Sequence, residues 1–345
     1  MRLTVRPQVA VALCVAIAGI LATACASSGN APTVVIYTSV DQHFSEPVLK
    51  AFESATGIRV RAVYDVEAAK TTGVVNRLLA EKNRPQADVF WNSEFAQTLL
   101  LREQGVLAAY DSPAAVDIPE QFRDQDRYWT GIAGRARVII VNTQRLAGRE
   151  PPRSIHDLLN DEWPADQVAM AYPLMGTTCT QAAALYAAWG GEKARDFFSH
   201  VKARGVRIVD GNATVRDMVA DGRLLWGLTD TDDAAGAIER GAPVSVIFPD
   251  QREGGQGTPV MPNTVALVAG APHPEAGRRL IDYLLSRDVE RDLVQAGWSH
   301  APVRDVGVTP RHIGVSNVRP LNVKLQEVYR HLDRAKRELS EVFVR

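Results

Sequence analysis

Residues 33–40 read TVVIYTSV, a short β-branched run after a proline, which predicts a buried strand. A helix is predicted next, from Ser45 to about Ala55, because Ser45 can cap it and Pro47 fits its first turn. The same order then repeats, with strands at 58–66 and 87–91 and helices at 72–82 and 95–103. Strands that alternate with helices predict a mostly parallel sheet covered on both faces.

An irregular stretch, residues 111–134, separates this half from a second one with the same alternation. The second half has predicted strands at 137–141, 168–172, 206–209, 224–228, 244–248 and 263–268, and helices at 178–188, 212–220, 274–286 and 322–342, with a further helix ending at 240. Two α/β halves joined by irregular segments predict two lobes with a cleft between them. In open α/β sheets, ligands bind at the carboxyl ends of the strands.

The N-terminus predicts export. Residues 1–6 carry two arginines and no acid, and residues 9–24 form an apolar run that is too short to span a membrane. The run ends in small residues before Cys25, and this stretch resembles a bacterial lipobox in which Cys25 becomes the lipidated N-terminus; an ordinary signal peptide is the alternative. The polar residues 27–32 would then form a tether.

Composition excludes several classes of protein. The 345 residues include 39 basic and 40 acidic side chains, so the basic excess of a nucleic-acid binder is absent. Three cysteines exclude a disulfide scaffold and a multi-cysteine metal site. The sequence has no nucleophile elbow, zinc-protease motif, P-loop or dinucleotide-binding motif, so an enzyme is not expected. An exported hydrolase remains an alternative.

Short motifs in order along the chain resemble bacterial periplasmic solute-binding proteins of ABC importers, in particular the ferric-iron-binding branch. The motifs are Tyr37-Thr38-Ser39, Ala51-Phe52-Glu53, Thr56-Gly57-Ile58, residues 87–92 (ADVFWN), residues 104–107 (QGVL), residues 134–137 (GRAR), residues 262–267 (PNTVAL) and residues 272–276 (PHPEA). The resemblance covers most of residues 33–300. It implies a type II periplasmic-binding-protein fold, a ligand held between two closing lobes, and a permease as partner.

The resemblance also implies a way to hold iron, through a histidine, a glutamate and two adjacent tyrosines. Glu94 matches the glutamate and His43 is a candidate for the histidine, so these two would be the metal ligands. The tyrosine pair is absent, because the chain has Asp230-Thr231-Asp232-Asp233 after the strand at 224–228. Ferric iron favours anionic oxygen donors such as phenolates, so a ferric-iron-binding protein is kept as the alternative.

Turns at the ends of strands supply the other candidate ligand residues. Gly176-Thr177-Thr178 begins a predicted helix, where free backbone N–H groups favour an anion, although Thr178 could simply cap the helix. Asn212 and Thr214 repeat this geometry, as do Thr71 and Thr72 beside Lys70 in the first half. Asp230 and Asp232 are expected to bind a donor group of the ligand across the cleft from the 176–178 turn, and Asp230 to support no core packing. The remaining candidates follow the first and third strands: Ser39, His43, Trp91, Asn92 and Glu94.

These observations predict a lipid-anchored binding protein of an ABC importer that captures an oxygen-rich ligand, such as an organic phosphate, phosphonate or carboxylate. We expect a monomer without a cofactor, exported to the cell envelope and held on the membrane through Cys25. The expected parts are a signal peptide (1–24), a tether (25–32), lobe 1 (33–125 and 260–310) and lobe 2 (135–255 and 311–345). The hinge crossovers are expected near 126–134 and 256–262.

Overall fold

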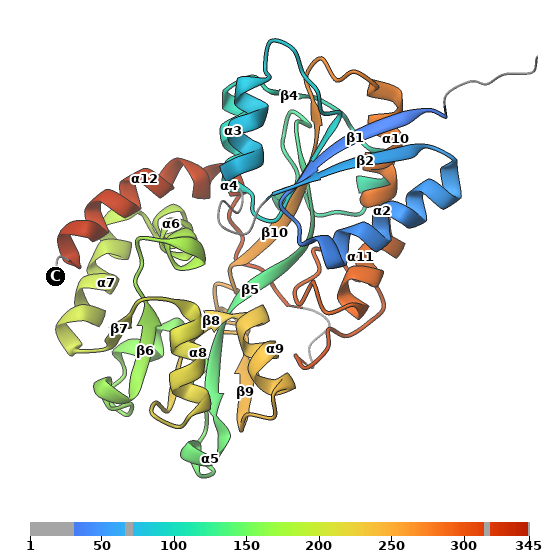
Figure 1. The fold of residues 1–345 in the computed structure, drawn as a ribbon. Coiled ribbons are helices and arrows are strands. Elements are labelled where there is room, and N and C mark those ends of the chain that lie inside the picture. Colours follow the sequence, from blue (N-terminus) through green and yellow to red (C-terminus); the bar gives the residue numbers. More distant parts are fainter. Residues whose placement is uncertain (1–30, 66–71, 314–317, 344–345) are drawn as a thin grey trace, which may run out of the picture. The chain divides into compact units, whose positions relative to one another are not determined.

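Two long strands, β5 (Thr130–Asn142) and β10 (Val260–Val268), organise the fold (Figure 1). They pair antiparallel with each other through residues 130–136 of β5. Beyond this point β5 continues into a second group of strands. The computed structural model describes residues 31–65, 72–313 and 318–343. The predictions for the signal peptide, Cys25, Lys70 and Thr71 lie outside the described residues. No helix within those three ranges is long and apolar enough to cross a membrane.

The first group of strands, which we call lobe 1 with its helices, contains the N-terminal elements. Its remaining strands are β1 (Thr33–Thr38), β2 (Arg59–Tyr64), β3 (Val89–Asn92) and β4 (Leu107–Ala108). β1 pairs in parallel with β2 and β3, and β10 closes the group by pairing antiparallel with β3 and β4. The predicted parallel arrangement therefore holds for the first three strands.

The second group, lobe 2, is built on the C-terminal half of β5. Its strands are β6 (Val168–Ala171), β7 (Arg207–Val209), β8 (Trp226–Asp230) and β9 (Val244–Ile247). β6 pairs in parallel with β7 and β8, while β8 and β9 pair antiparallel with β5. Each lobe thus contains three strands that pair in parallel with one another, while the pairs made by the linking strands are antiparallel.

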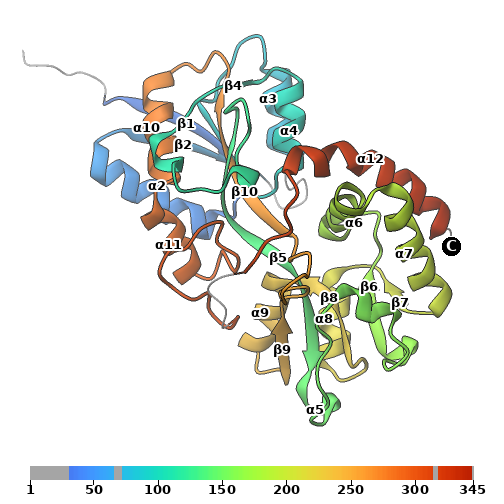
Figure 2. The same ribbon diagram turned by 180° about the vertical axis from the view of Figure 1, so that it is seen from behind.

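Helices flank both groups of strands (Figure 2). They are α2 (Gln42–Thr56), α3 (Thr72–Ala80), α4 (Ala96–Glu103), α5 (Thr143–Leu146), α6 (Gly176–Trp189), α7 (Gly191–Arg204), α8 (Asn212–Ala220), α9 (Thr231–Glu239), α10 (Pro274–Leu284), α11 (Arg287–Gln295) and α12 (Leu325–Val342). The final helix, α12, packs on α6 and α7 of lobe 2. Its first turns also reach lobe 1, where Tyr329 Oη donates to Glu103 at 3.1 Å.

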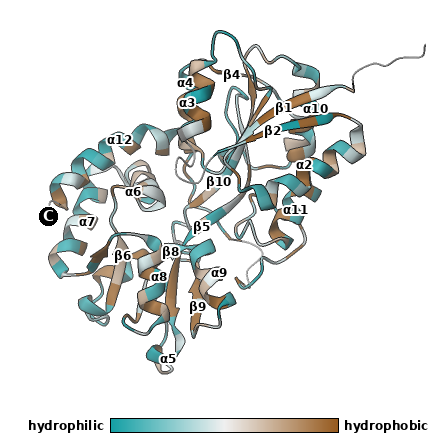
Figure 3. Cartoon of the chain, in the orientation of Figure 1, coloured by the Kyte–Doolittle hydropathy of each residue, from teal (hydrophilic) through white to brown (hydrophobic). Residues whose placement is uncertain are grey.

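Burial explains the strand pattern. All four residues of β3 and of β6 are buried, as expected for strands covered on both faces. Figure 3 shows hydrophobic residues concentrated on the strands and many hydrophilic residues on the helices. The side chains of Val138 and Ile140 on β5 pack with Val215 and Val219 of α8 in a core cluster of lobe 2.

Several predicted boundaries are wrong. α2 begins at Gln42, and Ser45 is a buried residue inside it whose Oγ lies 3.1 Å from the carbonyl oxygen of Asp41. The strand predicted at 137–141 in fact begins at Thr130. The prediction is too short because two glycines interrupt the apolar pattern in the first half of the strand. α7 and α11 were not predicted. α6 begins at Gly176, so Thr178 does not cap it.

Candidate functional site

A cavity of about 490 Å³ lies between the N-termini of α4 and α6, and we call it the α4–α6 cavity. Its walls come from both lobes, from the linking strands β5 and β10, and from α12. The lining residues are Glu94, Phe95, Ala96, Gln97, Arg135, Leu174, Met175, Gly176, Thr177, Cys179, Thr180, Met261, Leu332, Asp333 and Lys336. The volume is in the range of small-molecule sites, which often lie between domains.

The lobe 1 wall carries a carboxylate at a helix start. Glu94 lies two residues before the first residue of α4, and its carboxylate accepts the backbone N–H groups of Ala96 at 3.0 Å and Gln97 at 2.7 Å. Burial raises the pKa of Glu94, while these N–H groups and the charge of Arg135 act in the opposite direction. The N-terminus of α4 is therefore already occupied by an internal anion.

The lobe 2 wall has a helix start without such a partner. α6 is preceded by Met175, which is in extended conformation and makes no side-chain capping bond. Gly176, the first residue of α6, has a φ of +58° that suits glycine. The first N–H groups of a helix lack partners within the helix and carry partial positive charge. Because no side chain caps α6, its N-terminus suits an anion from outside the chain.

A buried ion pair lies behind the start of α6. Arg137, fully buried on β5, donates from Nη1 to Asp230 Oδ1 at 2.8 Å and to Asn212 Oδ1 at 3.0 Å. Thr177 Oγ1 donates to the other oxygen of Asp230, and Thr178 Oγ1 donates to Asn212 at 3.2 Å. Asp230 thus lies on the same side of the cleft as the 176–178 turn. The prediction that it faces this turn across the cleft is wrong, because Arg137 and Thr177 take up its carboxylate.

Sequence reasoning missed the two arginines of β5 as functional candidates. Arg135 and Arg137 occur at alternate positions of a buried strand, a pattern that signals side chains pointing to one face. Arg137 Nε also donates to Gln181 at 3.0 Å, while its Nη2 is buried without an acceptor among the residues described. Such an unpaired donor is costly, and an anion could satisfy it.

The acidic residues at the start of α9 form a compact group. One carboxylate oxygen from each of Asp230, Asp232 and Asp233 lies within 4.8 Å of the others. Burial and the charges of Asp232 and Asp230 raise the pKa of Asp233 to about 6. Two of the three already have basic partners, since Arg137 pairs with Asp230 and Arg216 lies 3.1 Å from Asp233. Asp232 is exposed.

A second cavity of about 380 Å³, the α2–α9 cavity, lies between residues of α2 and α9. It is lined by Asp41, Phe44, Gly134, Arg135, Asp232, Ala235, Gly236, Glu239, Asn263, Ala296, Gly297, Trp298, His300, Arg311 and His312. Arg135 lines both cavities. Asp232 lines the α2–α9 cavity, apart from the other predicted ligand residues.

Several of the remaining predicted ligand residues contact other parts of the protein instead of lining the α4–α6 cavity. Ser39 Oγ donates to Asn92 Oδ1 at 2.6 Å, and both residues are buried. Trp91 is fully buried in the core. His43 is exposed on α2 and lines a third cavity with Ser39, so His43 and Glu94 do not meet in one cavity.

Two threonines contribute less to the described site. Thr214 is exposed and lines none of the three cavities. Thr72 is the first residue of α3, and its side chain is outside the description. Among the predicted residues that the structure describes, Glu94, Gly176 and Thr177 line the α4–α6 cavity, and the others lie elsewhere.

Two lobes linked by long strands, with two helix starts lining a cavity between them, are the architecture of a two-lobed binding protein. Residues 84–317 match the family model of bacterial extracellular solute-binding proteins, and the chain belongs to this family. It is a solute-binding protein of an ABC importer with the type II periplasmic-binding-protein fold.

Similar proteins differ in the ligand that their names state. The chain is 26% identical over 305 residues, 86% of each chain, to the "Putative 2-aminoethylphosphonate-binding periplasmic protein" of Salmonella paratyphi A. It is 24% identical over 312 residues to iron uptake protein A1 of Synechocystis, covering 85% of this chain and 84% of the relative. A ferric binding protein of Bordetella superposes with a TM-score of 0.79 at 23% identity, covering 90% of this chain and 98% of that one.

Proposed function

We propose that the chain captures a small phosphonate or phosphate that also bears an amine, and that the α4–α6 cavity holds it. The observation that carries this proposal is the pairing of opposite charges within one cavity. Glu94 and Asp333 supply carboxylates, while Arg135 and Lys336 supply cations. A zwitterion of a few heavy atoms would match this pattern, and the name of the Salmonella relative gives such a ligand.

The phosphonate group belongs at the N-terminus of α6. There the uncapped backbone N–H groups and Arg135 can donate hydrogen bonds to its oxygens. Lys336 of α12 lines the same cavity and has no ion-pair partner within the described ranges. Charge-assisted hydrogen bonds of this kind are the strong ones, and the planar fork of arginine suits oxyanions.

The amine belongs at the opposite wall. Glu94 is held in place by two backbone N–H bonds, so its carboxylate is a fixed acceptor. Asp333 lines the cavity from α12 and is exposed. An ammonium group near these carboxylates would offset the cost of burying Glu94 as an anion.

Calorimetric titration tests this proposal. The wild-type protein should bind 2-aminoethylphosphonate, and ethylphosphonate, which lacks the amine, should bind more weakly. Arg135→Ala should weaken binding about 10- to 100-fold, because it removes a charged hydrogen-bond donor. Thr214→Ala, on the exposed start of α8, is the matched control and should bind like the wild type. Unchanged affinity in Arg135→Ala would place the ligand elsewhere.

Ferric iron is the competing ligand, and the same protein can be titrated with ferric citrate. Tyrosinate bound to iron absorbs visible light in iron-binding relatives, and this chain lacks the tyrosine pair. We therefore expect no visible band. A tight coloured complex that is weakened by both Glu94→Ala and His43→Ala would replace the phosphonate proposal.

We also propose that Cys25 carries a lipid anchor that holds the protein on the cell envelope. The support is the charged start, the apolar run and the small residues before Cys25. Cys25→Ser should release a folded protein from the membrane fraction. Continued membrane attachment of this variant would remove the anchor proposal and leave the binding site unaffected.

A further inference from the structure

The strand β5 contains an irregularity next to the cavity. In the pairing of β5 with β10, Pro262 lies opposite Gly134 and Asn263 opposite Ile132, so Ala133 has no partner. Ala133 also has a φ of +50°, which is uncommon for a residue with a side chain. An extra residue in one strand, in a left-handed conformation, is a β-bulge.

The bulge decides which way Arg135 points. Side chains of residues directly opposite each other in a sheet lie on one face, and successive residues alternate between faces. Arg135 lies opposite Met261, which is two residues from Asn263 on β10. Arg135 therefore shares a face with Met261 and Asn263, and both of these line the interlobe cavities. If Ala133 paired regularly with Pro262 and formed no bulge, Arg135 would lie opposite Val260 and point to the other face.

A buried carboxylate holds the bulge. Ala133 cannot donate its backbone N–H to β10, and Glu290 of α11 accepts it at 2.9 Å. The same oxygen of Glu290 accepts the N–H of Val303 at 2.8 Å, and the other oxygen accepts Nε of Arg304 at 2.9 Å. Glu290 is fully buried, and burial raises the pKa of its carboxyl, while these three donors favour the charged form.

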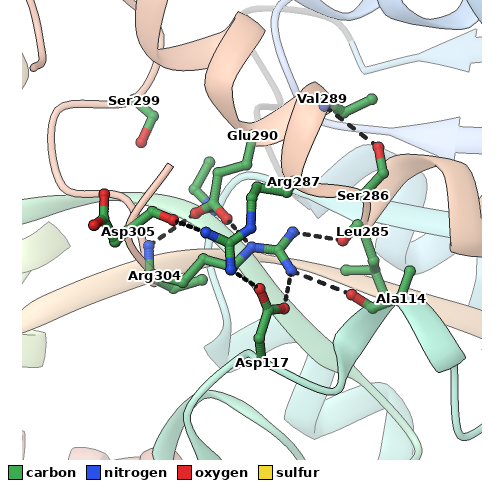
Figure 4. Close-up of polar contacts among 12 residues, drawn as sticks. Ala114, Asp117, Leu285, Ser286, Arg287, Val289, Glu290, Ser299, Arg304 and Asp305 are labelled. Atoms are coloured by element: carbon green, nitrogen blue, oxygen red, sulfur yellow. Dashed lines mark hydrogen bonds and ion pairs between the residues drawn. The ribbon is translucent and has the colours of Figure 1, made fainter. Parts of the chain in front are cut away.

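Two arginines and a second carboxylate surround the carboxylate of Glu290 (Figure 4). Arg304 reaches Glu290, the carboxylate of Asp117 and the carbonyl oxygen of Ala114, and Arg287 also pairs with Asp117. In the described parts of the chain, the carboxylate of Asp117 pairs with Arg287 and Arg304, and no hydrogen bond joins it to β5. The network therefore has an inner carboxylate, Glu290, at the bulge and an outer one, Asp117, that is paired with arginines.

The neighbouring residue of the bulge is held as well. Gly134 donates its N–H to Ser299 Oγ at 2.9 Å, and its carbonyl oxygen accepts the N–H groups of His300 and Ala301. A Cβ at position 134 would lie 3.0 Å from the carbonyl oxygens of Ala301 and Met261, so glycine is required by close packing. Glu290 of α11 therefore holds Ala133, and residues 299–301 after α11 hold Gly134.

From this arrangement we infer that Glu290 is a positioning residue for ligand binding: it fixes the bulge at Ala133 and thereby aims Arg135 into the interlobe cavities. The inference rests on the proposed function in assigning Arg135 to the ligand. Its structural half, the control of the Arg135 side chain by Glu290, stands on the bulge alone.

Crystal structures test the structural half without ligand. Glu290→Gln keeps the shape but loses the charge and turns one acceptor into a donor that faces Arg304. In this variant Arg135 should leave the cavities or occupy more than one conformation. Asp117→Asn, the matched control, removes the outer carboxylate and should leave Arg135 in place. An unchanged Arg135 in Glu290→Gln would overturn the inference.

Titration with 2-aminoethylphosphonate tests the functional half. Glu290→Gln should bind about tenfold more weakly, as expected for loss of one well-placed donor. The same change in an Arg135→Ala background should alter affinity by less than about twofold, because coupled residues are not additive. An equal loss in both backgrounds would show that Glu290 acts on general stability and not through Arg135.

A second variant keeps the test open if Glu290→Gln does not fold. Ser299→Ala removes the hydroxyl that accepts the N–H of Gly134. Like Glu290→Gln, it should move Arg135 out of the cavities, with a smaller loss of affinity. If the wild type fails to bind 2-aminoethylphosphonate, the proposed function is wrong, and the crystal structures still decide whether Glu290 controls Arg135. A crystal of Ser299→Ala with Arg135 unmoved would count against the inference.

Discussion

The N-termini of α4 and α6 line the same cavity, but they are built in opposite ways. At α4 the side chain of Glu94 accepts two backbone N–H groups, so the helix start already has its anion. At α6 no side chain caps the helix, and its nearby hydroxyl, Thr177, is turned toward Asp230 behind it. The difference shows how one cavity can offer a negative wall and a positive wall, although both walls are helix starts with the same dipole.

Breaking the support behind α6 should have the largest effect. Asp230→Ala leaves Arg137 as an uncompensated buried charge, and we expect a loss of about 3–5 kcal/mol in the free energy of unfolding. The sequence had suggested that Asp230 supports no packing, and that expectation is wrong because Asp230 is buried against Arg137. Urea denaturation measures the change. Asp232→Ala, at an exposed neighbour, is the control, and equal losses in both variants would contradict the prediction.

The sequence predicted the fold well because alternation of strands and helices is a local signal. The ends of β3 and β6 were located from short apolar runs, and these ends carry Glu94 and the 176–178 turn. The partner of Asp230 could not be predicted in the same way. Arg137 lies opposite Asp230 only because β5 pairs with β8, and that pairing joins residues 93 positions apart.

A third helix start, that of α9, adds a pH dependence. The pKa of Asp233 is raised to about 6, above its value of about 3.9 in an unfolded chain. The folded chain therefore binds more protons between about pH 4 and pH 6, and this group lowers stability as the pH rises through that window. Asp233→Asn removes the titration. Relative to the wild type, its free energy of unfolding should rise by about 2 kcal/mol between pH 4 and pH 8.

Asp217 serves as the control, because its pKa is shifted in the opposite direction. Arg216 lowers the pKa of Asp217 through a hydrogen bond, so Asp217 contributes stability above its unfolded pKa and loses it as the pH falls. Relative to the wild type, Asp217→Asn should become less stable as the pH rises. Urea unfolding at pH 4, 6 and 8 compares the two variants, and parallel curves would refute the assignment.

Removing the charge from the α4 wall should change ligand preference. Glu94→Gln keeps an acceptor for one of the two α4 N–H groups but loses the negative charge that we assign to the amine. Binding of 2-aminoethylphosphonate should weaken about tenfold, while binding of ethylphosphonate should stay the same or tighten. Calorimetric titration of both compounds gives the ratio. A proportional loss for both compounds would mean that Glu94 does not recognise the amine.

The smallest expected effect concerns the backbone at the start of α6. Gly176 has a φ of +58° and open space where a Cβ would lie, so Gly176→Ala meets no clash and costs about 1 kcal/mol for its left-handed conformation alone. Gly211, before α8, also has open space but an extended conformation, so Gly211→Ala should cost almost nothing. Because the strain falls on the residue whose N–H begins α6, Gly176→Ala should also weaken phosphonate binding, and Gly211→Ala should not. Thermal unfolding and titration of the pair separate these effects, and equal behaviour of both variants would show that the α6 start is not held in the conformation that anion binding requires.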